Sequence, residues 1–206
     1  LKRGEKSIIY SNFKKDEIGG VLRIAELLKK NYEQYSDKQE NVEKAKEKVE
    51  ETVSAGPKLR FALFTSDQTE TERNNAVMLF NHPSNTNGEY LKLLLITKSG
   101  SEGITFLGVR HVHIIEPHWN MVRLNQVCGR ARRYLSHNNL PVEKRNVSVF
   151  LYIMSFRNCT LQEKAVFADP IKKDSYLSTD EHILNMAIDK QILNNEFQNC
   201  LKEISI

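Results

Sequence analysis

Three polar side chains in the segment Gln126–Arg133 (QVCGRARR) have the types and the spacing to bind phosphate. If the segment is helical, Gln126, Arg130 and Arg133 stand at positions i, i+4 and i+7 and share one face. Two guanidinium groups there would suit an anionic ligand, because arginine binds phosphate oxygens bidentately and keeps its charge during phosphoryl transfer. A solvated basic helix face is the alternative interpretation.

A second segment, Thr97–Thr105 (TKSGSEGIT), is rich in small and hydroxyl side chains and directly follows an apolar run. Loops at the carboxyl ends of strands line ligand crevices in open α/β sheets. The glycines allow close backbone approach, and the hydroxyls and amides suit phosphate oxygens. An ordinary strand-to-helix turn has a similar composition, and no P-loop (G-x-x-x-x-G-K-[ST]) occurs in the sequence.

Four other residues have chemically useful types, but we favour structural roles for them. His111 and His113 would face the same side of a strand, yet no third ligand is near them in sequence, so no metal site is predicted. Cys128 is expected to be a small packing residue, although a neighbouring guanidinium could lower its pKa. Trp119, the single tryptophan, is expected to anchor the turn before the arginine-bearing segment.

Five apolar runs rich in β-branched and aromatic residues predict the strands that position these segments. The runs are nearly continuous rather than alternating, which is typical of strands covered on both faces, and helical patterns lie between several of them. The sequence therefore predicts an α/β fold with a mostly parallel sheet and helices on both faces. The runs are Ser7–Phe13, Leu59–Thr65, Leu91–Thr97, His111–Glu116 and Val147–Met154.

Apolar residues at helical spacing predict four helices, at 18–28, 67–80, 119–134 and from Thr179 onwards. The hydroxyl of Thr179 is expected to cap the last of these, which forms a C-terminal helical extension at 178–206.

The segment 37–51 is almost entirely charged, and Val42, Ala45 and Val49 form a thin apolar stripe along it. A helix with so few apolar residues can bury only an edge. We therefore predict a charged helical insertion at 36–57 that projects from the core, with a partner-docking arm as the alternative.

The composition, with 40% hydrophobic and 27% charged residues, fits one globular domain over residues 1–206 and excludes a disordered or fibrous chain. The three cysteines are widely spaced, so we expect no disulfide framework and an intracellular, reducing compartment. No apolar run approaches the roughly 18 residues that a membrane span needs, so no membrane partner is predicted. The net charge of +4 is compatible with a polyanionic partner, and the first residue, leucine, suggests a piece of a longer polypeptide.

The segments with the chemistry match a known pattern. Leu94–Phe106 (LLITKSGSEGITF), then Glu116–Asn120 (EPHWN) and Gln126–Arg133, resemble motifs V and VI of the superfamily 2 helicases in order and spacing. The pair Trp119–Asn120 resembles the sequence pattern of the Snf2-like branch of that superfamily.

The flanking segments extend this resemblance over nearly the whole chain. Ser7–Phe13, Phe61–Thr65 and a helix ending in Phe80–Asn81 resemble the first elements of the second RecA-like lobe. The tail from Ser178 to Glu203 resembles helicases of nucleocytoplasmic large DNA viruses. This group includes poxvirus nucleoside triphosphatase I, the small subunit of the early transcription factor, and asfarvirus members.

The resemblance implies the second RecA-like lobe of an ATP-dependent helicase or translocase. ATP and Mg²⁺ would be bound mainly through a first lobe, so this chain alone is expected to be inactive as an ATPase. Arg130 and Arg133 would complete the ATP site, with Gln126 orienting phosphates or coupling the lobes. The implied nucleotide-coupling residues are Glu102, Gly103 and Thr105, and the candidates for nucleic-acid backbone contacts are Asn12, Lys14, Thr97 and Ser99.

The expected partners are a DNA or RNA backbone, the first lobe of the same protein and viral transcription or packaging proteins, in the host cytoplasm or the virion. The main alternative is a non-enzymatic assembly module. Arg130 and Arg133 discriminate between the two interpretations, because such a module would not need two arginines on one face. A standalone nucleotide- or phosphate-binding protein is a further alternative, against which the missing P-loop argues.

Overall fold

A computed structural model of the chain describes residues 5–14, 19–98, 104–156 and 177–204. The chain forms two compact units, Leu1–Ile114 with Val127–Phe150 and Ile115–Gln126 with Leu151–Ile206. Each unit is described by itself below.

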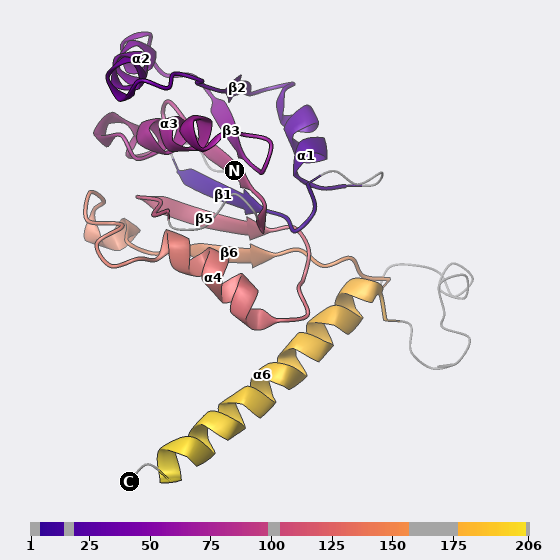
Figure 1. Cartoon of the computed structure of the whole chain (residues 1–206). Coiled ribbons are helices and arrows are strands. Elements are labelled where there is room, and N and C mark those ends of the chain that lie inside the picture. The colour runs from indigo at the N-terminus through magenta and orange to yellow at the C-terminus, as the bar shows by residue number, and fades with distance from the viewer. Residues whose placement is uncertain (1–4, 15–18, 99–103, 157–176, 205–206) are drawn as a thin grey trace. The chain divides into compact units, whose positions relative to one another are not determined.

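The first unit is built on a sheet of six strands in the order β2-β3-β4-β1-β5-β6 (Figure 1). The first strand of the chain, β1, therefore lies inside the sheet between β4 and β5. The pairs β2–β3, β3–β4, β1–β4 and β1–β5 are all parallel, as predicted. The strands are β1 (Lys6–Tyr10), β2 (Glu33–Tyr35), β3 (Arg60–Phe64), β4 (Leu93–Ile96), β5 (Val109–Ile114) and β6 (Ser148–Leu151).

Both faces of the sheet are covered. Every side chain of β1, β3 and β4 is buried, and successive side chains of a strand point to opposite faces. The helix α1 (Val21–Leu28) connects β1 to β2 in one direction across the sheet, whereas α3 (Glu70–Phe80) connects β3 to β4 in the opposite direction. Right-handed crossovers that run in opposite directions place their helices on opposite faces, so the predicted α/β layering is confirmed.

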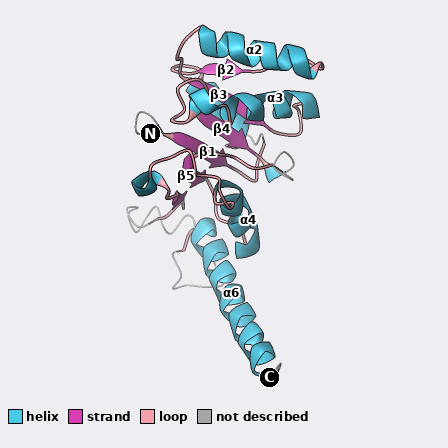
Figure 2. Cartoon of the chain, turned by 90° about the vertical axis from the view of Figure 1, so that its left-hand side faces the viewer, coloured by secondary structure: helices cyan, strands magenta, loops and turns pink. Residues whose placement is uncertain are grey.

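The charged segment forms α2 (Val42–Ser54), capped by the side chain of Asn41. This helix connects β2 to β3 and packs along α3 (Figure 2). Ala45 and Val49 are 0% and 2% exposed, whereas Val42 is 61% exposed. The apolar edge is thus buried as predicted, but the helix is a crossover between paired strands and does not project from the core.

The end of α3 is fixed by side chains that bind its last carbonyl group. Phe80 O accepts hydrogen bonds from Lys6 Nζ (2.8 Å) and from Asn85 Nδ2 (2.9 Å). Lys6 also lies over the Phe80 ring, 4.7 Å from its centroid. The start of α3 is closed by a capping box between Thr69 and Glu72. Both ends of α3 are therefore anchored.

In the second unit, the C-terminal helix is α6 (Thr179–Ile204), and its cap is Ser178 rather than the predicted Thr179. Ser178 N donates to Glu181 Oε2 (2.8 Å), and Glu181 N donates to Ser178 Oγ (3.1 Å), which is a capping box. Lys190 lies over the Trp119 ring, 4.2 Å from its centroid.

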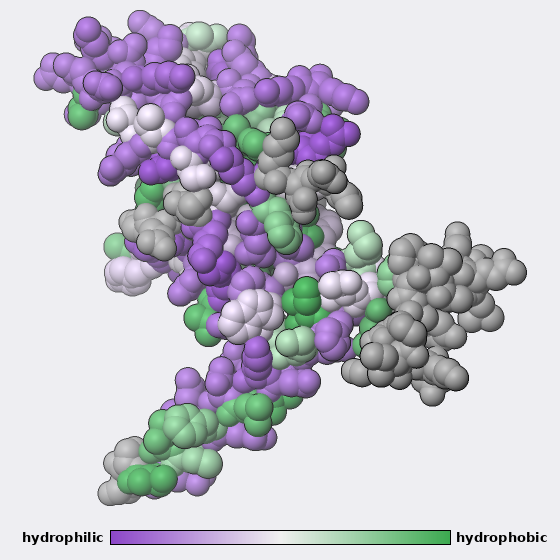
Figure 3. Space-filling view, turned by 45° about the vertical axis from the view of Figure 1, so that its right-hand side comes forward, coloured by the Kyte–Doolittle hydropathy of each residue, from purple (hydrophilic) through white to green (hydrophobic). Residues whose placement is uncertain are grey.

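Beyond residue 191 every described side chain of α6 is exposed, apolar ones included (Figure 3). No helix among the described residues is long and apolar enough to cross a bilayer. The other helices of the described part of the chain are α4 (Met121–Ala131), within which the boundary between the units falls, and the short 3₁₀ turns η1 (Pro83–Asn85) and η3 (Val142–Lys144).

Candidate functional site

The carboxyl ends of three neighbouring strands meet at one edge of the sheet. Tyr10 of β1 and Phe64 of β3 both pair with Ile96 of β4. The hydrogen bonding continues one residue further, because Ser11 N donates to Ile96 O (3.2 Å) and Thr97 N donates to Phe64 O (3.2 Å). Residues that follow β1 and β4 are therefore presented side by side, as ligand sites in open α/β sheets require.

Asn12, Lys14 and Thr97, which were predicted to contact a nucleic-acid backbone, all lie at this edge. Asn12 Oδ1 accepts a hydrogen bond from the Tyr10 hydroxyl (2.9 Å), and the Lys14 ammonium forms an ion pair with the Asp67 carboxylate. Thr97 is only 3% exposed, so its side chain supports the edge instead of facing solvent. Asn12 and Lys14 are partly exposed.

The two phosphate-binding candidates predicted separately, Arg133 and Thr105, contact each other. Arg133 Nη1 donates a hydrogen bond to Thr105 Oγ1 (2.7 Å). Arg133 is not on the face of α4 as predicted, because the helix ends at Ala131 and the chain turns there, with Ser136 N bonded to Arg133 O (3.0 Å). Leu135, at φ 62°, has the left-handed conformation that ends helical continuation.

Arg130, the other predicted arginine, is tied to the same segment through its backbone. Arg130 O accepts a hydrogen bond from Phe106 N (3.5 Å), and Arg130 is partly buried. Phe106 is fully buried and packs edge-on against Phe64 and Phe80, each with ring centroids 6.0 Å apart. The residues next to Thr105 are therefore anchored in the core of the first unit.

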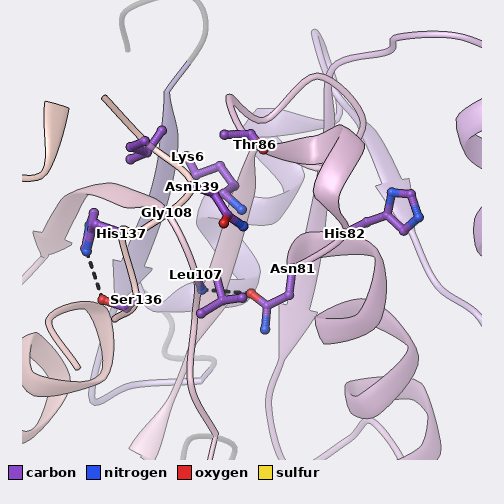
Figure 4. Close-up of a pocket in the computed structure, with 10 residues that line it drawn as sticks. Lys6, Asn81, His82, Thr86, Leu107, Gly108, Ser136, His137 and Asn139 are labelled. Atoms are coloured by element: carbon purple, nitrogen blue, oxygen red, sulfur yellow. Dashed lines mark hydrogen bonds between the residues drawn. The ribbon is translucent and has the colours of Figure 1, made fainter. Parts of the chain in front are cut away.

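Asn81, directly after α3, holds the opposite side of this segment. Its Nδ2 donates to Thr105 O (2.9 Å), and its Oδ1 accepts from Leu107 N (2.8 Å; Figure 4). The sequence offered only the resemblance of Phe80–Asn81 to a helix end. Both partners of Asn81 are backbone atoms about 25 residues away, and no residue pattern signals such a bond.

The model of the family described as "Helicase conserved C-terminal domain" matches residues 1–135, which include this whole site. The chain belongs to the helicase C-terminal domain family. The predicted resemblance to the second lobe of helicases is thereby confirmed.

Curated relatives of this helicase C-terminal domain include proteins of large DNA viruses. It is 35% identical over 147 residues to the "Termination factor NPH-I homolog" of African swine fever virus, covering 71% of this chain and 20% of the relative. It is 33% identical over 141 residues to the "Nucleoside triphosphatase I" of Heliothis armigera entomopoxvirus, covering 68% and 19%. The chain thus spans about a fifth of the length of the curated relatives it matches.

Among solved structures, the C-terminal part of the Fun30 ATPase domain aligns with a TM-score of 0.48 and 16% identity, covering 95% of this chain and 48% of that chain.

The remaining predicted site residues of the helicase C-terminal domain lie in the second unit or outside the described residues. Gln126 is an exposed residue of α4 and belongs to the second unit. Ser99, Glu102 and Gly103 lie outside the described residues.

Cys128 is buried, and burial raises the pKa of its thiol, an effect that Arg132 offsets only in part. The thiol is therefore protonated and suited to packing, in agreement with the structural role predicted for it.

The two strand histidines of the helicase C-terminal domain have structural partners. His113 stacks on Phe150 with ring centroids 5.0 Å apart, and His111 Nε2 lies 3.3 Å from Glu5 Oε2. Burial is the main cause that lowers the pKa of His113, and the nearby His111 lowers it further. Within the described residues, no group of three potential ligand side chains could hold a metal ion.

The geometry suits an anionic ligand at Arg133. Its guanidinium is exposed and has one nitrogen engaged by a hydroxyl, so the other donors of the fork can bind oxygens. Phosphate oxygens fit this donor set, whereas the described residues offer no acidic cluster for Mg²⁺.

Proposed function

We propose that this chain is the second RecA-like lobe of an ATP-dependent superfamily 2 helicase or translocase. In this proposal Arg133 and Arg130 act on the phosphates of ATP, and Gln126 helps to orient them or couples the lobes. The observation that carries the proposal is the hydrogen bond from Arg133 to Thr105, because it unites segments that resemble motifs V and VI. A fixed guanidinium can stabilise negative charge on a transferring phosphoryl group.

ATP and Mg²⁺ belong mainly to a first lobe in this proposal. The chain lacks a P-loop, and the part of it that matches the curated relatives covers only about a fifth of their length, so those relatives have room for such a lobe. The names of those relatives, a nucleoside triphosphatase and a termination factor homolog, support use of a nucleotide. The chain alone is expected to be inactive as an ATPase.

The nucleic-acid partner, DNA or RNA, would be held by its backbone at the carboxyl edge of the sheet. Asn12 and Lys14 offer an amide and an ammonium group there, and Ser99 follows β4 in the sequence. Such groups bind phosphates without reading bases. The name of the termination factor homolog supports work alongside viral transcription proteins. Packaging proteins as partners, and a location in the host cytoplasm or the virion, belong to the same proposal.

The test uses the full-length protein with Arg130→Ala, Arg133→Ala and Arg133→Lys, and Arg23→Ala as the control. Arg23 is an exposed residue of α1 that pairs with Glu26. Each alanine variant at the site should keep its fold and nucleic-acid affinity and lose roughly 10³-fold in ATP turnover. Lysine should rescue poorly, since a point charge lacks the bidentate geometry.

The second candidate is a non-enzymatic assembly module, which the exposed apolar side chains of α6 favour. Near-normal turnover in both alanine variants would refute the arginine site and favour this candidate. Turnover equal to that of the Arg23→Ala control would have the same meaning.

A further inference from the structure

We infer that Asn81 is a positioning residue for the arginine site: it fixes the backbone of Thr105 to Leu107 and, through Thr105, sets the place of the Arg133 guanidinium. The inference rests on the proposed role of Arg133. It adds a residue that lies outside both motif-like segments, at the end of α3.

The two hydrogen bonds of Asn81 enclose Phe106. One holds the carbonyl group before Phe106 (Asn81 Nδ2 to Thr105 O, 2.9 Å), and the other holds the amide after it (Leu107 N to Asn81 Oδ1, 2.8 Å). With two points of the backbone fixed, the segment cannot rotate. The Thr105 side chain therefore has a fixed direction, and its hydroxyl accepts from Arg133 at 2.7 Å.

Asparagine is suited to this task because its planar amide offers a donor and an acceptor together. Aspartate would keep the acceptor for Leu107 N but would place a second oxygen against Thr105 O. Alanine would leave both backbone groups without this partner. The identity of residue 81 thus matters even though the side chain reaches no predicted ligand.

The base of Asn81 is itself rigid. Asn81 N donates to Val77 O (2.8 Å) as the C-cap of α3, and Lys6 holds the preceding Phe80 carbonyl. Thr105 therefore cannot shift unless the end of α3 shifts with it. This continuous path, from α3 through Asn81 to Thr105, is what keeps an exposed arginine in one place.

Asn85 is a matched control. It is also an asparagine near the end of α3 and bonds only to backbone, donating to Phe80 O and Leu91 O and accepting from Tyr90 N and Leu91 N. It is fully buried, whereas Asn81 is only partly buried, and it makes no bond to the Thr105 segment. Loss of stability alone would therefore harm Asn85→Ala more than Asn81→Ala.

The experiment measures steady-state ATP hydrolysis by the full-length protein with Asn81→Ala, Asn81→Asp and Asn85→Ala, at a temperature where melting curves show each folded. Asn81→Ala should lower kcat by about 10- to 100-fold with KM for ATP changed less than about threefold, because misplacing a group that acts in the transition state lowers kcat. The near-isosteric Asn81→Asp should be similarly slow, since it loses the bond to Thr105 O. Asn85→Ala should stay within about twofold of wild type, because Lys6 still holds Phe80 O and Asn81 keeps both of its bonds to the Thr105 segment.

A double variant provides a second test, and its result does not depend on the Asn85→Ala control. If Asn81 acts through Arg133, then Asn81→Ala combined with Arg133→Ala should be no slower than Arg133→Ala alone. Two results would overturn the inference and leave the proposed function standing. In the first, the losses of turnover caused by Asn81→Ala and Arg133→Ala multiply in the double variant. In the second, Asn81→Ala behaves like Asn85→Ala while Arg133→Ala is roughly 10³-fold impaired. Normal turnover in Arg133→Ala would instead refute the proposed function.

Discussion

Replacing Lys6 by methionine should remove a pH dependence from the stability of the fold. Lys6 is 2% exposed, and burial lowers the pKa of its ammonium group from 10.5 to about 7, an effect that Glu89 opposes. Between these two values the unfolded chain carries a proton that the folded chain has released. The free energy of unfolding must therefore rise as the pH rises through this window, and the contribution is flat below about pH 7.

The size of the effect follows from the two pKa values. A folded value of about 7 and an unfolded value of 10.5 give a gain of about 2 kcal/mol in the free energy of unfolding between about pH 7 and pH 9. Methionine has a comparable length and cannot titrate, so the Lys6→Met variant lacks this gain. It also loses the hydrogen bond to Phe80 O, which changes its stability by an amount that does not depend on this titration.

The assay is urea unfolding of wild type and variant at several pH values across this window, with m-values checked for constancy. Other titrating groups contribute equally to both proteins, so the difference between the two pH slopes isolates Lys6. The exposed Lys58, replaced by methionine, serves as a control for the removal of a lysine from the surface. Parallel curves for wild type and Lys6→Met would refute the reasoning.

Three further predictions concern other parts of the chain. Val49→Asp should lower the free energy of unfolding, measured in urea, by more than about 2 kcal/mol, because it puts an unpaired charge at a buried position of α2. Val42→Asp, at an exposed position, should lower it by less than about 0.5 kcal/mol. Equal losses would contradict the crossover packing of α2. Alkylation followed by peptide mass spectrometry should find Cys200 modified in the native state and Cys128 only on unfolding, and early labelling of Cys128 would show that its thiol is not buried. In the full-length protein, Lys14→Ala should weaken nucleic-acid binding at every sequence and reduce the salt slope by about 1, and an unchanged slope would remove Lys14 from the backbone contacts.

The sheet was predictable because buried parallel strands are continuous apolar runs, and each of the five predicted runs overlaps a strand. The strand β2 was not predicted, because Glu33–Tyr35 has only three residues, two of them polar, and lies at the sheet edge. Without β2, the charged segment had no strand before it, and α2 was interpreted as an insertion instead of a crossover. Its buried edge, Ala45 and Val49, was nevertheless visible in the spacing.

The candidate site was predictable only in its residue types. The spacing of Arg130 and Arg133 indicated a shared ligand, but helical geometry gave the wrong reason, because Arg133 lies beyond the end of α4 and is placed by Thr105. Asn81 and Lys6 were not predicted as functional or buried residues. Their partners are carbonyl and amide groups of distant segments, and every residue carries such groups, so the sequence cannot mark them.

The central position of β1 has a consequence for how the protein is made. Ser7 pairs with Leu93 on one side and with His111 on the other, 86 and 104 residues further along the chain. Among β1, β4 and β5, β1 is synthesised first, so it must wait until residue 114 has been added before both of its neighbours exist. We expect closure of the sheet around β1 to be the slow, non-local step of folding. Until that step, the facing edges of β4 and β5 offer unpaired backbone groups, which makes the nascent chain the form most prone to wrong strand pairing.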